Sequence, residues 1–121
     1  MNNLRPMELL KNIPFSEPLA VNDMVEYKDG QVISRTLVQN KYLSMTVFAF
    51  DKGEGLSTHS APADALVHVL DGQAAISIDG KPFTVKAGEV IAMPADIPHG
   101  VTAEERFKML LVVVKKTSAQ G

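Results

Sequence analysis

Tight-turn signals recur at short intervals along most of this sequence, and they limit its fold more than any other feature. Asp29-Gly30 precedes one apolar segment, and Asp79-Gly80 separates two others. Dipeptides of this kind favour the tight turns of β-hairpins. About eight short strands at intervals of roughly ten residues favour an antiparallel sandwich or barrel over any helical fold. We therefore predict an all-β domain.

The expected strands are apolar segments that end at glycine, asparagine or proline residues. Some alternate in polarity, so that Ala74, Ile76 and Ile78 share one face. Others are apolar on both faces, which is typical of strands that are covered on both sides. The segments expected to form strands are 32–39, 42–51, 66–71, 74–79, 83–85, 90–93 and 106–115.

The length of 121 residues suits one domain whose core needs no disulfide. Residues 1–30 carry weak signals, and Pro14 and Pro18 keep the chain extended there. We expect residues 1–30 to form an N-terminal arm packed on the barrel. Within the arm, Pro6 is placed to start one or two helical turns over residues 6–11. Residues 31–118 are then the β-barrel domain.

Composition excludes several kinds of site and partner. The chain has no cysteine, which excludes disulfides, thiolate metal ligands and cysteine nucleophiles. The net charge is −2 and no long basic segment occurs, so we expect no nucleic-acid partner. The longest apolar run, 109–114, is far too short to span a bilayer, so we expect no membrane partner. The N-terminus shows no apolar segment typical of a secretion signal, and we expect a cytoplasmic protein.

Three histidines, His59, His68 and His99, are candidates for a polar site. Side chains alternate between the two faces of a strand, so His68 points outward if Ala65 and Val67 point inward. Strands that are far apart in sequence become neighbours around a barrel wall. His59 and His99 are therefore the candidates for an interior site, whereas His68 is expected to pack at a subunit contact.

Glycines, a proline and two histidines on either side of the Asp79-Gly80 turn agree in order and spacing with two known motifs. These residues are Gly53, His59 and Gly72 before the turn, and Gly88, Pro94 and His99 after it. Over residues 43–114 the chain thereby resembles the cupin superfamily. The resemblance implies a cupin-type antiparallel β-barrel, also described as a double-stranded β-helix or jelly roll.

The first motif departs from the family pattern at two positions. In cupins, a second histidine and a glutamate join the two histidines as ligands of a divalent metal, but Ala61 and Ala65 stand at those positions here. The resemblance therefore implies a divalent transition metal (Zn, Fe, Ni or Cu) held by His59 and His99 alone. A catalytic metal usually has three protein ligands. Asp64 is a substitute ligand only if the chain bends it inward, against the alternation of its strand.

The two alanines also leave a more apolar space beside the histidines. The residues that we expect to line this pocket are Met45, Ala61, Ala65, Val67, Val69 and Met93. Such a pocket, with a few convergent polar groups, suits a small-molecule ligand.

The residues leave three functions open. The first is a small cupin that binds a small molecule in the barrel together with a metal held by two histidines. The second is a metal-dependent cupin enzyme, an oxygenase or an isomerase. The third is a metal-free ligand-binding or sensing module in which the histidines are hydrogen-bonded pocket residues. Because this fold supports many unrelated activities, we assign no reaction from it.

Apolar side chains also lie on the expected outward faces of two strands. They are Leu66 and Leu70 on one strand, and Leu110, Val112 and Val114 on the other. Such faces indicate a contact with another sheet or subunit. Small cupins of this kind are often homodimers, and we expect a homodimer here.

Overall fold

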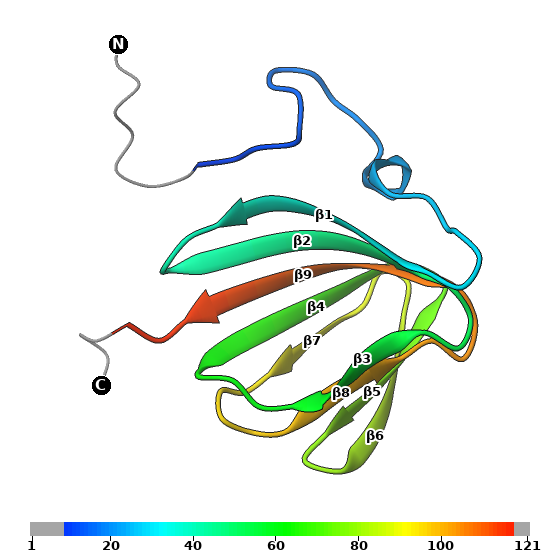
Figure 1. Cartoon of the computed structure of the whole chain (residues 1–121), viewed down its shortest axis with the longest axis vertical. Helices are drawn as coiled ribbons and strands as arrows, with labels where there is room; N and C mark the ends of the chain where they lie inside the picture. The colour runs from blue at the N-terminus through cyan, green and yellow to red at the C-terminus, as the bar shows by residue number, and fades with distance from the viewer. Residues whose placement is uncertain (1–8, 118–121) are drawn as a thin grey trace.

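The computed structural model describes residues 9–117, which form two antiparallel sheets of nine strands in all (Figure 1). The five-stranded sheet has the order β1 (Val32–Gln39), β2 (Leu43–Phe50), β9 (Phe107–Lys115), β4 (Ala63–Asp71) and β7 (Val90–Met93). The four-stranded sheet has the order β3 (Gly55–His59), β8 (His99–Thr102), β5 (Gln73–Ile78) and β6 (Lys81–Lys86). The predicted all-β barrel is confirmed.

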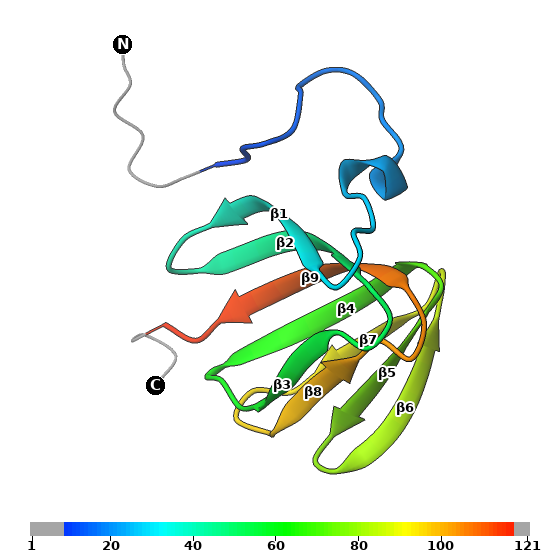
Figure 2. The same cartoon turned by 45° about the vertical axis from the view of Figure 1, so that its right-hand side comes forward.

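The main hydrophobic core lies between the two sheets, which face each other in Figure 2. Alternation along β4 turns Val67 and Val69 into this core, and both are fully buried. β2 contributes Phe50, whose ring stacks on that of Phe107 of β9 at 4.7 Å between centroids. The large buried side chains of the core are Phe50, Val67, Val69, Ile76, Phe107 and Met109.

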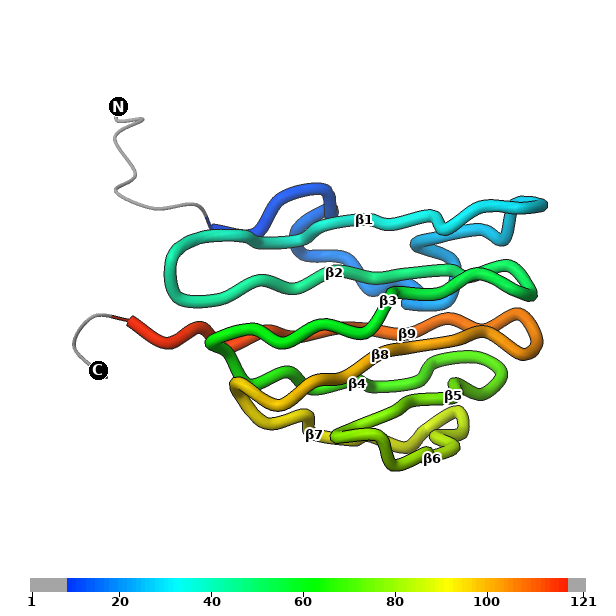
Figure 3. Tube along the Cα trace, turned by 60° about the horizontal axis from the view of Figure 1, so that its bottom comes forward, coloured from blue at the N-terminus to red at the C-terminus, as the bar shows by residue number. Residues whose placement is uncertain are grey.

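A second core cluster lies on the outer face of the five-stranded sheet. The arm before β1 runs alongside β1 and β2 (Figure 3) and packs Met24 and Val25 there. These side chains cover Val47 and Ala49 of β2, which are fully buried although they point away from the barrel interior. Each face of β2 is covered, one by the barrel core and the other by the arm, which explains why the strand has apolar residues on both faces.

The arm contains one 3₁₀ helix, Val21–Met24, and is otherwise irregular in the part that the structure describes. Residues 6–8 of the helical segment predicted at 6–11 lie outside the described residues, and residues 9–11 are not helical. Within residues 9–117, no helix is long and apolar enough to cross a membrane.

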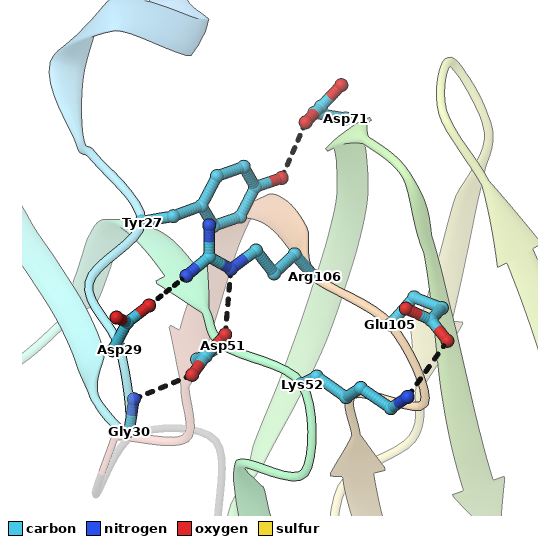
Figure 4. A network of polar contacts seen from close by, with 8 residues as sticks. All are labelled: Tyr27, Asp29, Gly30, Asp51, Lys52, Asp71, Glu105 and Arg106. Atoms are coloured by element: carbon cyan, nitrogen blue, oxygen red, sulfur yellow. Dashed lines mark hydrogen bonds and ion pairs between the residues drawn. The ribbon is translucent and has the colours of Figure 1, made fainter.

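One network of polar contacts between the end of the arm and the barrel is formed around Arg106, just before β9 (Figure 4). Its Nε donates to Asp51 at 2.7 Å, and its Nη2 donates to Asp29 at 2.5 Å. The backbone N–H of Gly30 donates to the other oxygen of Asp51 at 2.6 Å. We call Asp29, Gly30, Asp51 and Arg106 the arm clasp, because they join the end of the arm to two barrel segments.

Candidate ligand-binding site

His59 and His99 lie side by side, at the ends of the neighbouring strands β3 and β8. They are paired in the β3–β8 register, and their ring centroids are 4.7 Å apart with an angle of 62° between the ring planes. His99 is buried, whereas His59 is exposed. Two residues separated by forty positions in the sequence thus form one pair on the barrel wall.

A β-bulge in β3 sets this pairing. Leu56 pairs with Val101, so regular alternation would place Thr58 opposite His99. The register instead shifts between Leu56 and His59, and the extra residue brings His59 opposite His99. Bulges often re-aim a side chain in this way beside a functional site.

Two glycines let β3 and β8 approach closely. A Cβ on Gly55 would meet the backbone carbonyl oxygen of Val101, and a Cβ on Gly100 would lie 2.8 Å from Oγ1 of Thr58. Close approach of two backbones is one of the uses of glycine within strands. The histidine pair therefore depends on small residues in its own two strands.

Hydrogen bonds to the backbone fix the orientation of both imidazoles. Nδ1 of His59 lies 2.9 Å from the carbonyl oxygen of Ser57, and Nδ1 of His99 lies 3.1 Å from that of Ile97. A carbonyl oxygen only accepts, so each Nδ1 must carry the proton and donate. In the neutral imidazole this leaves the lone pair on Nε2, which is free to accept a hydrogen bond or to bind a metal.

The two histidines line a cavity of about 530 Å³ between the sheets. A volume of this size lies within the range of small-molecule sites, roughly 300–1,000 Å³. Its lining contains no aspartate, glutamate, lysine or arginine. The lining residues are Gly55, Leu56, Ser57, His59, Ala61, Ala63, Ala65, Met93, His99, Gly100, Val101, Met109, Leu111 and Val113.

Five of the six predicted pocket residues point toward the barrel interior, and three of these line the cavity. Ala61, Ala65 and Met93 line the cavity beside the histidines. Val67 and Val69 point inward but are fully buried in the core cluster rather than part of the cavity lining.

Met45 lies on the opposite face of its strand from the predicted one. It packs against the second cluster, under the arm, together with Val47 and Ala49. Phe48 and Phe50 take the interior positions of β2. Because β2 is apolar on both faces, its pattern could not indicate which face points inward.

The contribution of β9 to the cavity is not predicted by the sequence pattern. Leu111 and Val113 line it from the five-stranded sheet, opposite the histidine pair of the other sheet. The signal that identifies them is their pairing: Val113 lies next to Ala65, and Leu111 next to Val67, in the β4–β9 register. Cross-strand neighbours share a face, but this register is not visible in one sequence.

The side chains near the histidine pair do not complete a metal site. Among residues 9–117, no three histidine, cysteine, aspartate or glutamate side chains are grouped closely enough to hold an ion. Asp64 is exposed and accepts a hydrogen bond from the N–H of Ala95 at 2.8 Å. Two imidazoles can supply part of a metal coordination shell, but further ligands would have to come from outside the described residues.

His68 lies apart from this pair. It pairs with Leu110 of β9 and Val90 of β7, on the outward face of the sheet. Its exposure is intermediate, and its neighbour Leu66 is 40% exposed.

Fold and site together define a small β-barrel domain with an apolar cavity between its sheets and a histidine pair on the cavity wall. The model of the Cupin domain family matches residues 46–114. The chain belongs to the cupin family, as the glycine, proline and histidine pattern predicts.

Solved structures of similar proteins agree with this assignment. A protein of unknown function from Streptococcus pyogenes is 44% identical with a TM-score of 0.89, over 94% of this chain and 100% of that one. A cupin superfamily protein from Desulfitobacterium hafniense is 30% identical with a TM-score of 0.86, over 90% and 100% of the two chains.

A Cupin 2 conserved barrel domain protein from Leptotrichia buccalis is 54% identical with a TM-score of 0.76, over 78% of this chain. The match spans 46% of the Leptotrichia chain, so this chain is similar to less than half of it. No curated protein matches the chain.

Proposed function

We propose that this cupin binds a small organic molecule in the cavity between its sheets, with His59 and His99 as its polar contacts. One observation carries the proposal: two imidazoles, each held by its Nδ1 on a backbone carbonyl, line a largely apolar cavity of about 530 Å³. Cavities of this kind, apolar with a few convergent polar groups, are typical ligand sites.

A cavity-filling variant tests this proposal without knowledge of the ligand. The wild-type chain and Ala65→Leu are screened by thermal shift against one set of neutral and charged small molecules. A compound that binds the folded state raises the stability by about 2.7 kcal/mol at a hundred times its Kd. We expect the hits to lose their shift in Ala65→Leu, because the larger side chain fills the cavity.

The matched control is Ala87→Leu, which makes the same change at an exposed residue in the turn between β6 and β7, outside the cavity lining. Hits must persist in this variant. If hits keep their shift in Ala65→Leu, they bind elsewhere and the proposal is wrong.

A two-histidine site for a divalent transition metal is a second candidate, favoured by the same pair of Nε2 atoms. Such a metal, when bound, supplies the Lewis-acid or redox chemistry on which an oxygenase or isomerase reaction would depend. The chain itself would hold the imidazoles in place through the Ser57 and Ile97 carbonyls.

Elemental analysis of protein purified without chelators tests the metal candidate. Near one equivalent of a transition metal, lost in His59→Ala and His99→Ala but kept in His68→Ala, would support it. A content at background level after reconstitution with zinc, iron, nickel or copper would reject it and leave the metal-free binding function.

A further inference from the structure

We infer that the cavity selects an uncharged, largely apolar molecule that presents one weakly acidic hydroxyl group, of the phenol or enol kind, to one of the two Nε2 acceptors of His59 and His99. This inference rests on the proposed function, since it names the class of ligand for the same cavity. Three features of the cavity carry it: the missing charges, the apolar walls and the direction of the histidine hydrogen bonds.

The cavity offers no fixed charge to a charged ligand. Its lining contains no aspartate, glutamate, lysine or arginine. The polar side chains of the lining are those of Ser57, His59 and His99. Transfer of a charged group from water into an apolar site without a partner is strongly unfavourable. A phosphate, a carboxylate or an ammonium group is therefore a poor fit, and an uncharged molecule is favoured.

The walls favour an apolar body with a single polar end. The five-stranded sheet presents only apolar side-chain atoms to the cavity, from Ala65, Met93, Leu111 and Val113. A molecule with hydroxyl groups all around it, such as a sugar, would bury several of them against these walls without partners. A flat ring system or an alkyl body would instead gain from leaving water.

The histidine pair determines the chemistry of the polar end. Each Nδ1–H already donates to a backbone carbonyl, of Ser57 or of Ile97, so Nε2 of each neutral ring is an acceptor. A ketone or an ether has no donor to offer and would cover these acceptors without satisfying them. A hydroxyl donates, and the more acidic proton of a phenol or enol makes the stronger hydrogen bond to imidazole.

Three probes of one shape separate these requirements. β-Naphthol, its methyl ether and β-naphthoate are titrated into the metal-free protein by calorimetry at about pH 8. We expect β-naphthol to bind about tenfold more tightly than the ether, the effect of one well-made hydrogen bond. We expect β-naphthoate to bind more weakly than both, because its charge has no partner.

Variants of two histidines test where the hydroxyl binds. The hydroxyl proton is accepted by one Nε2, so the preference for β-naphthol over its ether should fall to about threefold or less in one of the variants His59→Leu and His99→Leu, each checked for folding by circular dichroism. An unchanged preference in both variants would overturn the inference. His68→Leu is the matched control, since His68 lies on the outer face of the sheet, and it should keep the full preference. His59 is exposed, so its replacement should leave the fold intact.

The outcomes separate the inference from the proposed function. Equal binding of β-naphthol and its ether overturns the hydroxyl requirement, and tightest binding of β-naphthoate overturns the exclusion of charge. In either case the proposed function stands if Ala65→Leu still abolishes binding. If none of the three probes binds, the inference is wrong, while the proposed function is still judged by the hits of the wider screen.

Discussion

Ala61 and Ala65 are the residues that separate this chain from a cupin with a complete set of metal ligands. Both line the cavity that also contains His59 and His99. They thus stand on the cavity wall at the positions where the family's first motif has a histidine and a glutamate. Compared with that motif, the chain lacks two ligand side chains, although the backbone positions that would carry them line the cavity.

This reasoning predicts a gain of metal binding on substitution. The double variant Ala61→His and Ala65→Glu should bind nickel or zinc at least about a hundredfold more tightly than the wild type, a gain of about 2.8 kcal/mol. The added imidazole and carboxylate would complete the ligand set of a catalytic metal. Isothermal titration calorimetry of the chelator-treated proteins measures the difference.

The control is Ala61→Leu with Ala65→Gln, which adds comparable bulk with no good metal ligand. It should gain nothing. A double variant that is folded, as judged by circular dichroism, yet binds no more tightly than the wild type would show that the two positions do not face the histidines.

Phe107 is a large side chain of the main hydrophobic core. Its ring is fully buried and stacks on that of Phe50. Replacement of a core phenylalanine by alanine costs about 3–5 kcal/mol. We therefore expect Phe107→Ala to lower the free energy of unfolding by this amount in urea titrations. Phe83→Ala is the control: its side chain is 43% exposed, and we expect a much smaller loss.

At the level of elements, β3 and β8 build the site and the arm covers the sheet opposite. The bulge in β3 aligns His59 with His99, and Gly55 and Gly100 let the two strands approach. The arm has a different role. It buries the outward side chains of β2, and the arm clasp joins its C-terminal end to the barrel.

The arm clasp predicts a pH dependence of stability. The hydrogen bond from Arg106, reinforced by that from Gly30, lowers the pKa of Asp51 from 3.8 to about 2. A carboxyl whose pKa is lower in the folded state stabilises the fold above its unfolded pKa, and this contribution is lost as the pH falls through the folded pKa. The clasp should therefore stabilise the protein above pH 3.8 and lose this effect as the pH falls to about 2.

Thermal unfolding of Asp51→Asn over this pH range tests the clasp. Its Tm should be lower than that of the wild type at neutral pH, and the difference should shrink below pH 3.8. The exposed pair of Lys52 and Glu105, 3.6 Å apart, is the control (Figure 4). Exposed pairs of this kind contribute little, so Lys52→Ala should change neither the Tm nor its pH dependence. A Tm difference for Asp51→Asn that is constant with pH would contradict the prediction.

At the scale of the whole molecule, the outer face of the five-stranded sheet is only partly covered. The arm buries the outer side of β2, and Leu70 and Leu110 pack against the same cluster. Farther along the sheet, Leu66 is 40% and Val90 is 56% exposed. Contiguous apolar surface on a sheet is typical of a subunit contact. We propose that a second copy of the chain covers this part of the face.

Sedimentation at micromolar concentration tests this dimer. We expect a dimer for the wild type and a monomer for Leu66→Lys, because a lysine at the centre of an apolar contact would bury an unpaired charge. Phe83→Lys is the control, since Phe83 is similarly exposed on β6 of the other sheet, and it should remain dimeric. A monomeric wild type would refute the proposal.

Much of the fold could be predicted because its signals are local. Turn dipeptides and short apolar segments predict β1 and β7 with their observed bounds, Val32–Gln39 and Val90–Met93, and they predict β9 to within one residue. The two histidines could be selected as an inward pair from strand alternation and from the family motifs. Each of these signals lies within a few neighbouring residues, so most strands, the turns and the family could be predicted, whereas the bounds of the short strands β3 and β8 could not.

Contacts between distant segments determine which face of β2 points inward and how the histidines are held. β2 is apolar on both faces, and the arm, which is distant along the chain, covers the face of Met45. The bulge that aligns His59 with His99 depends on the pairing of β3 with β8, and the cavity wall at Val113 depends on the pairing of β9 with β4. These features arise from contacts between distant segments, and no local pattern of side chains encodes the register in which such segments meet.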